Sequence, residues 1–272
     1  MQHITFTRAG LAATLALAAC AASAAPVTTW TYAITSAFDT DPSVTTFVSS
    51  GTNPANPVNS STSYWTSDTL LQWGQKTGSI AAGTRSGLEI TNTPATGTVD
   101  TNGSFVAANS YTHYNNNALG ANSYTLSTTK IDSVLSLYAE GMEQVFSTAY
   151  SVYFLETPNT NATCPVKETN PCSDIFVLVG SFGESFVYNG YEYSFEFISD
   201  PSFTQLTDAQ CVAAGYAAGC YGFATPEGQD YTVNFAFRVV ATAVPEPASV
   251  ALVGLGLLGL AGIRRRQGTK QG

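Results

Sequence analysis

A period-two alternation of large apolar and polar side chains runs through most of this chain, and it is clearest between Ser185 and Ile198. Asn189-Gly190 divides that stretch, and this dipeptide supplies the two positive-φ residues of a type I′ hairpin turn. After the turn, the aromatic residues at 191, 193, 195 and 197 fall on one face and polar residues on the other. One buried and one solvated face is typical of an antiparallel sheet packed against a second sheet.

The same alternation predicts strands along the rest of the chain, at Thr29–Ile34, Ser123–Leu137, Val145–Leu155, Ile175–Val179 and Val233–Val239. We therefore predict an all-β fold, an antiparallel, jelly-roll-like β-sandwich, over residues 25–243. About 220 residues suffice for one such domain with a single core. The stretch at 123–137 fits one long two-faced strand, with positions 124, 126, 128 and 130 on one face, or a pair of strands.

One short helix is expected near 207–218. Thr207 suits an N-cap, and Gln210 three residues later completes a capping box. Alanine-rich residues follow, and Gly219 would end the helix. Two stretches rich in small polar residues are expected to be loops, at Ser49–Ser63 and Thr157–Pro171.

The N-terminus has the features of a secretory signal peptide. Arg8 precedes the apolar stretch Leu11–Ala22, and Ala22-Ser23-Ala24 offers small residues for signal peptidase, so residues 1–24 are expected to be removed. Leu17-Ala18-Ala19-Cys20 also fits a lipoprotein cleavage site with a lipidated Cys20. Ordinary cleavage is favoured, because one acyl chain binds membranes only marginally and would duplicate the C-terminal signal described next.

The C-terminus combines three elements in a fixed order: Pro245-Glu246-Pro247, an apolar run at 248–263, and Arg264-Arg265-Arg266. As a helix the run would span about 24 Å, slightly less than the roughly 30 Å hydrocarbon core. We expect a marginal transmembrane helix with the arginines on the cytoplasmic side. A permanent anchor is the alternative, but it leaves Pro-Glu-Pro without a role.

This arrangement resembles the PEP-CTERM sorting signal of Gram-negative, biofilm-forming bacteria, over residues 244–272. The same element is sometimes catalogued as an ice-binding protein C-terminal domain, a label that describes the tail alone. The resemblance implies an exosortase-type enzyme that cleaves near Pro245, Glu246 and Pro247. It also implies transient residence in the inner membrane and release to the cell surface or extracellular matrix.

A second resemblance lies within the predicted sandwich. Thr112-His113-Tyr114-Asn115 is similar to the Thr-His-x-Asn signature of the THxN subfamily of PEP-CTERM proteins. The similarity extends to Phe154–Asn159, Cys172–Leu178, Cys211–Cys220 and Gly222–Glu227. It implies sorting and architecture but no activity, so Thr112, His113 and Asn115 are a candidate motif of unknown role.

Four cysteines remain after signal-peptide removal: Cys164, Cys172, Cys211 and Cys220. They fall into two close pairs, and in an exported chain this favours the disulfides Cys164–Cys172 and Cys211–Cys220 among three connectivities. Zinc is the alternative, but the spacings lack the two-residue knuckles of zinc ribbons.

The negative net charge of the chain limits the kinds of molecule that it is expected to bind. The chain has a net charge of −9 and only 11% charged residues, and residues 26–243 carry 18 acidic but five basic side chains. The absence of a basic patch argues against nucleic acid. Acidity promotes solubility and is compatible with cations. Asp100-Thr101-Asn102-Gly103 is a weak Ca²⁺ candidate, but an ordinary Asn-Gly turn is favoured, so no metal site or cofactor is predicted.

His113 is the one histidine left after signal-peptide removal, which excludes a catalytic zinc site with two or three histidines. A Ser-His-Asp triad needs a single histidine, but no G-x-S-x-G motif is present. Thr112 and Asn115 could orient the ring by hydrogen bonds, but a structural histidine where the strand meets a turn formed by Asn115–Asn117 is favoured.

We predict a non-enzymatic, structural or adhesive protein of the biofilm or exopolysaccharide matrix, with His113 in a structural role. The alternative is a secreted hydrolase that uses the His113 region. A carbohydrate-binding module with Trp30, Trp65 and Trp73 as sugar-stacking residues is a further alternative. A cleft that holds His113 together with a carboxylate and a hydroxyl would favour the hydrolase.

Overall fold

The computed structural model describes residues 25–49, 64–74, 85–116, 124–157, 164, 166, 172–180 and 183–244. The expected signal peptide (1–24), the sorting residues Pro245 to Pro247 and Arg264 to Arg266, and the predicted membrane segment (248–263) lie outside these ranges, as do most of the two predicted loops. Among the described residues, no helix is long and apolar enough to cross a membrane.

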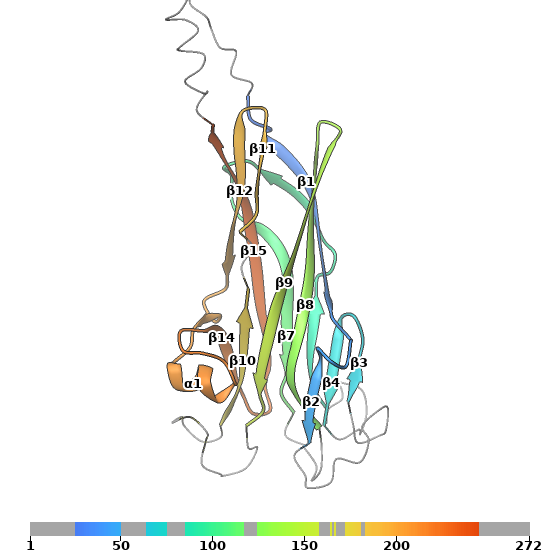
Figure 1. Ribbon diagram of the computed structural model, residues 1–272, viewed down its shortest axis with the longest axis vertical. Coiled ribbons are helices and arrows are strands. Elements are labelled where there is room, and N and C mark those ends of the chain that lie inside the picture. Colours follow the sequence, from blue (N-terminus) through green and yellow to red (C-terminus); the bar gives the residue numbers. More distant parts are fainter. Residues whose placement is uncertain are drawn as a thin grey trace, which may run out of the picture.

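Two antiparallel sheets pack face to face along the long axis of the molecule (Figure 1). The first has the strand order β13-β14-β10-β9-β8-β1-β6, with β2 paired to β8. Its strands are β1 (Thr29–Phe38), β2 (Thr46–Ser49), β6 (Ala95–Asp100), β8 (Tyr124–Ala139), β9 (Met142–Leu155), β10 (Ser173–Val179), β13 (Thr204–Gln205) and β14 (Tyr221–Pro226).

The second sheet has the order β11-β12-β15-β7-β5-β4-β3. Its strands are β3 (Trp65–Thr66), β4 (Leu70–Trp73), β5 (Ser86–Thr91), β7 (Val106–Tyr114), β11 (Ser185–Tyr188), β12 (Tyr191–Ser199) and β15 (Asp230–Ala243). The predicted all-β fold is confirmed, and each stretch predicted as strand contains one.

The aromatic hairpin forms as its sequence predicts. Asn189 and Gly190 both have positive φ, at 50° and 77°, and join β11 to β12. Tyr193 and Phe195 are buried, while Glu192 and Glu196 on the opposite face are exposed. The two-residue turn therefore determines which face of β12 enters the core.

The stretch at 123–137 forms one strand, β8, but its two faces differ from the prediction. Phe47 pairs with Leu126 and Thr46 with Thr128, so Ser127 is an extra residue on β8. In a regular strand, two residues an odd number of positions apart point to opposite faces. The bulge reverses the face that points inward, so Leu126 and Ile131, five positions apart, are both fully buried. Lys130, predicted on the face of Leu126, instead forms an ion pair with Asp132.

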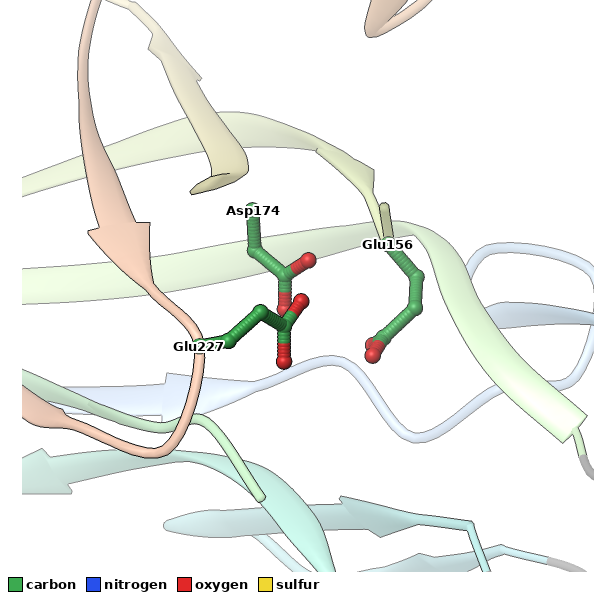
Figure 2. A group of neighbouring side chains, drawn as sticks. All are labelled: Glu156, Asp174 and Glu227. Atoms are coloured by element: carbon green, nitrogen blue, oxygen red, sulfur yellow. The ribbon is translucent and has the colours of Figure 1, made fainter. Parts of the chain in front are cut away.

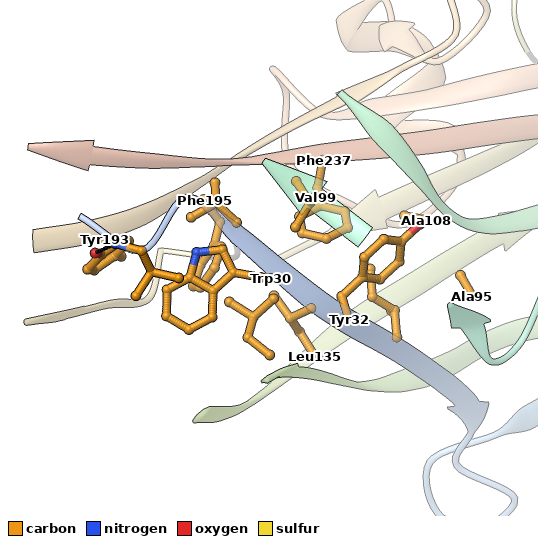
Figure 3. Close-up of a cluster of buried hydrophobic side chains, with 13 residues drawn as sticks. Trp30, Tyr32, Ala95, Val99, Ala108, Leu135, Tyr193, Phe195 and Phe237 are labelled. Carbon is orange, nitrogen blue, oxygen red and sulfur yellow. Dashed lines mark hydrogen bonds between the residues drawn. The ribbon is translucent and has the colours of Figure 1, made fainter. Parts of the chain in front are cut away.

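The core between the sheets is strongly aromatic (Figure 3). Trp30 on β1 packs edge-on against Tyr193, with ring centroids 5.3 Å apart, and Tyr32 packs edge-on against Phe237 at 4.9 Å. The Trp30 indole also donates a hydrogen bond to Thr101 Oγ1 (3.0 Å). Trp30 and Trp73 are fully buried, so neither is available to stack on a sugar; among the three tryptophans only Trp65 is exposed.

The helix, α1 (Asp208–Ala213), is shorter than predicted. Its capping box forms: the side chain of the N-cap Thr207 accepts from the Gln210 backbone amide, and the Gln210 side chain accepts from the Thr207 backbone amide. The chain leaves the helix at Gly215, whose φ of 88° favours glycine, rather than at Gly219. Both predicted disulfides are confirmed, and Cys211–Cys220 ties the helix to the residue before β14.

Candidate functional site

The Thr-His-x-Asn segment lies at the end of β7, a central strand of the second sheet. Alternate side chains of a strand point to opposite faces. His113 therefore faces the space between the sheets, where its ring stacks on Trp73 with centroids 5.9 Å apart. Thr112 faces the other way and shares a hydrogen bond with Thr232 on the paired strand β15 (2.8 Å).

The His113 ring is enclosed by aromatic side chains. Its exposed fraction is 0%, and Phe154 packs against it edge-on at 5.0 Å. Neither ring nitrogen has a hydrogen-bond partner. Thr112 and Asn115 therefore do not orient the ring by hydrogen bonds: Thr112 lies on the opposite face, and Asn115 donates to the Thr225 carbonyl (3.0 Å).

Three carboxylates gather opposite His113, and the strand register explains why. Ile175 pairs with Leu155, so Glu156, the next residue beyond β9, lies across from Asp174 on β10. Asp174 also pairs with Thr225 on β14, and Glu227 follows two residues later on the same face. Figure 2 shows the three acidic side chains converging from separate segments. One carboxylate oxygen from each lies within 4.8 Å of the others.

Each carboxylate has one oxygen held by a donor. Asp174 Oδ1 accepts from the Thr157 amide (2.7 Å) and the Thr157 hydroxyl (3.1 Å). Glu156 Oε2 accepts from the Trp73 indole (2.8 Å), and Glu227 Oε1 lies 3.5 Å from the Thr157 hydroxyl, whose one proton it shares with Asp174. The second oxygen of each carboxylate is buried without a hydrogen-bond partner. The protein therefore orients three carboxylates but leaves one oxygen of each unpaired.

Burial disfavours charge on all four titratable groups. Burial, then the neighbouring charge of Glu227, raises the pKa of Asp174 well above its ordinary value. Burial and the charges of Asp174 and Glu227 do the same for the pKa of Glu156. Burial raises the pKa of Glu227 to about 7, against the opposing effect of the Thr157 hydroxyl. Burial lowers the pKa of His113 to about 3, so its imidazole is neutral at pH 7.

His113 Nε2 is the nearest potential cation to these carboxylates, 3.8 Å from Asp174 Oδ2. Within the described part of the chain, no lysine or arginine forms an ion pair with Glu156, Asp174 or Glu227. In the part of the chain that the structure describes, the cluster is thus acidic, largely buried and without a lysine or arginine partner.

Among the described residues, the His113 side chain is fully buried and does not reach the surface. His113 has a carboxylate nearby, but its ring is enclosed and bonds to no hydroxyl. A separate cavity of about 350 Å³ lies between the sheets, lined mainly by apolar residues such as Leu135, Phe195 and Phe235, and His113 is not among its lining residues.

The turn at Asp100–Gly103, the weak Ca²⁺ candidate, has its side-chain oxygens engaged within the protein. Asp100 Oδ1 accepts from the Thr29 hydroxyl (2.7 Å), and Asn102 Oδ1 accepts from the Ala241 amide (3.0 Å). Asn102 has a φ of 57°, as a tight turn requires. These contacts fasten the turn to β1 and β15.

The sequence analysis singled out His113 and Asn115 but not the carboxylates around them. Glu156, Asp174 and Glu227 each lie in one of the segments quoted for the THxN resemblance. That co-occurrence was the available signal, since three of the four segments each contribute one acidic residue to the cluster. Sequence spacing alone did not connect them, because 71 positions separate Glu156 from Glu227.

The C-terminus shows a clear likeness to a known element. Residues 243–266 match the PEP-CTERM protein-sorting motif. No curated protein matches the chain.

Proposed function

We propose that this chain, whose residues 243–266 form a PEP-CTERM sorting motif, is a non-enzymatic protein of the cell surface or extracellular matrix with a structural or adhesive role. The motif implies export and recognition by an exosortase-type sorting enzyme. It is the observation that carries the proposal, because it specifies delivery to the outside whatever the sandwich binds there. Exopolysaccharide is the proposed partner.

The position of the motif supports a role as a presented domain. The match begins at Ala243, the last residue of β15, and this 14-residue strand spans about 45 Å. The acidic cluster lies near the other end of β15, because Glu227 stands three residues before Asp230, the first residue of that strand. Figure 1 shows β10 and β14, the strands beside the cluster, at the end of the sandwich away from the C-terminal end of β15. A sandwich held by its tail would thus carry the cluster at its far end.

The sandwich itself supports a structural role over a catalytic one. His113 is enclosed, as described above, and two disulfides stabilise loops next to β10 and β14. Disulfides persist in oxidising compartments outside the cytosol.

Intact-mass analysis of the secreted protein tests the sorting step. We expect a C-terminus near Pro245 to Pro247, without Arg264 to Arg266. Glu246→Ala should leave the protein in the membrane fraction, whereas the exposed hairpin variant Glu192→Ala should be released normally. A secreted form that retains the arginines would contradict exosortase processing.

Matrix association tests the role after delivery. The secreted protein should co-sediment with purified exopolysaccharide of the producing cells and should release no soluble sugar or ester products from it. Cleavage of the polysaccharide that is lost in a folded His113→Ala variant would instead support the hydrolase alternative.

A further inference from the structure

We infer that one divalent transition-metal cation connects the two sheets at the acidic cluster, with four ligands: Glu156, Asp174, Glu227 and His113. The first three lie on or beside strands of the first sheet, and His113 belongs to the second. The ion would act as a structural cross-link at the end of the sandwich farthest from the sorting motif.

The unpartnered atoms are the first argument. Glu156 Oε1, Asp174 Oδ2 and Glu227 Oε2 are buried and lack hydrogen-bond partners, as do both nitrogens of His113. Asn115 Oδ1 and Thr225 Oγ1 add two further unpartnered oxygens in the same region. Buried polar atoms are nearly always paired. This many unpaired buried atoms at one place therefore indicate a missing ligand.

His113 provides an observation independent of the carboxylates. It is a fully buried, unpartnered side chain whose Nε2 lies 3.8 Å from the unpartnered Oδ2 of Asp174. A histidine with a purely structural role would pair at least one nitrogen. An imidazole nitrogen and a carboxylate oxygen 3.8 Å apart, both without hydrogen-bond partners, are instead spaced as two ligands around one ion.

The carboxylate distances fit a single ion after a small adjustment. Ligands bonded at about 2.1 Å lie at most about 4.2 Å apart across the metal. The three carboxylate oxygens lie within 4.8 Å of one another, so side-chain shifts of about half an ångström would bring them around one ion. These side chains have such freedom, because each is tethered through one oxygen only. His113 Nε2 is 3.8 Å from Asp174 Oδ2 but lies outside this mutually close group, so its ring has to move further toward Glu156 and Glu227 when the ion binds.

The donor set selects the class of metal. Carboxylates bind many divalent ions, but imidazole nitrogen favours ions such as Zn²⁺ over Ca²⁺, which takes oxygen ligands. Three carboxylates and one imidazole make an oxygen-rich mixed site, for which Mn²⁺ and Zn²⁺ are the appropriate probes. When the three carboxylates ionise, the neutral His113 offsets none of their charge, whereas a divalent cation neutralises two of the three negative charges.

The surrounding contacts are those of oriented metal ligands. The Trp73 indole holds Glu156, and Thr157 holds Asp174 and Glu227, each through the oxygen that would face away from the ion. Outer partners of this kind fix ligand direction and raise affinity. Glu156 and Glu227 retain partial exposure, which provides access for the ion from solvent.

The test uses the untagged secreted protein, stripped with EDTA and dialysed. Calorimetric titration with Zn²⁺ and with Mn²⁺ should show one saturable equivalent for at least one of them. At about 100 times the dissociation constant, the melting temperature should rise by about 5–10 °C. Ca²⁺ should bind more weakly than that ion.

Four variants assign the ligands. Asp174→Asn and Glu156→Gln should each weaken binding by more than about 100-fold, so one result remains if the other variant does not fold. Thr157→Val, which removes only the outer hydroxyl, should weaken it about 10-fold. His113→Phe keeps a packed ring and should also abolish tight binding. The matched control is Glu196→Gln, an exposed carboxylate paired with Arg238, and its affinity should be unchanged.

Two results would overturn the inference. If none of the ions binds below about 1 mM, the carboxylates are held by shared protons rather than by a metal. If Ca²⁺ binds best and His113→Phe leaves its affinity intact, the site is not a transition-metal site and His113 is not a ligand.

Discussion

His113 Nε2 lies 3.8 Å from Asp174 Oδ2, across the boundary between the two sheets, and neither atom has a hydrogen-bond partner. Much of this boundary is filled by aromatic and aliphatic side chains, and the buried Ser36–Asn109 contact that also crosses it is hydrogen-bonded (2.7 Å). The His113–Asp174 contact therefore marks a place where the sandwich places polar groups in its interior at a cost in folding free energy. The predictions that follow concern this cost and the features that surround it.

The first prediction concerns pH and Glu227. Burial raises its pKa from an ordinary 4.5 to about 7, so the folded state binds a proton more tightly than the unfolded state. This group's contribution to stability is fully present below about pH 4.5 and is lost as the pH rises through about 7. With EDTA present, the melting temperature of Glu227→Gln relative to that of the wild type should therefore rise as the pH increases from 5 to 8.

Thermal melts of both proteins across that range provide the measurement. The gap between the two melting temperatures should widen as pH rises. A constant gap would show that Glu227 titrates normally in the folded protein. Glu196→Gln, at an exposed carboxylate, is the control and should show no such trend.

The second prediction concerns His113 in metal-free protein. His113→Phe removes two unpaired nitrogens and keeps a ring against Trp73 and Phe154, so the free energy of unfolding should stay equal or rise by about 1–3 kcal/mol. His113→Ala leaves a cavity and should cost about 2–5 kcal/mol. Urea unfolding in EDTA measures both. A His113→Phe protein much less stable than the wild type would mean that the nitrogens have partners in solution.

The third prediction concerns the disulfides. Each closes a short loop, with the two cysteines eight or nine positions apart, and should contribute about 2–3 kcal/mol to the free energy of unfolding. Double alanine variants of each pair, compared by urea unfolding, give the two values. Non-reducing peptide mapping should recover Cys164 linked to Cys172 and Cys211 linked to Cys220. A crossed pair such as Cys164 with Cys211 would contradict the structure.

The fourth prediction concerns the close approach of β10 and β14. A Cβ atom at Gly222 would lie 1.9 Å from the Phe176 carbonyl oxygen, which is backbone and cannot rotate away. Gly222→Ala should therefore destabilise the protein by about 1–3 kcal/mol or more. Gly183→Ala is the matched control, since a Cβ there meets nothing within 4 Å, and it should stay within about 0.5 kcal/mol. Equal melting temperatures for the two variants would contradict the strand spacing.

Local sequence determined much of the architecture. Asn189-Gly190 determined a two-residue hairpin, because both residues adopt positive φ readily. The alternation in β12 and β15 determined which side chains enter the core, and the capping box at Thr207 determined where α1 begins. Two close cysteine pairs in an exported chain were enough to predict both disulfides. The Pro-Glu-Pro motif, apolar run and arginines identified the sorting element by themselves, since a linear signal is read as sequence.

Only the tertiary structure decided the rest. The bulge at Ser127 has no local signature, yet it reverses the inward face of β8, because an extra residue shifts a period of two by one. The acidic cluster is likewise invisible in sequence spacing. Glu156, Asp174 and Glu227 meet through pairing of β9, β10 and β14, and His113 reaches them only because a second sheet packs on the first. Strand pairing joins residues distant in the chain, so the chemistry at this end of the sandwich exists only once both sheets have formed.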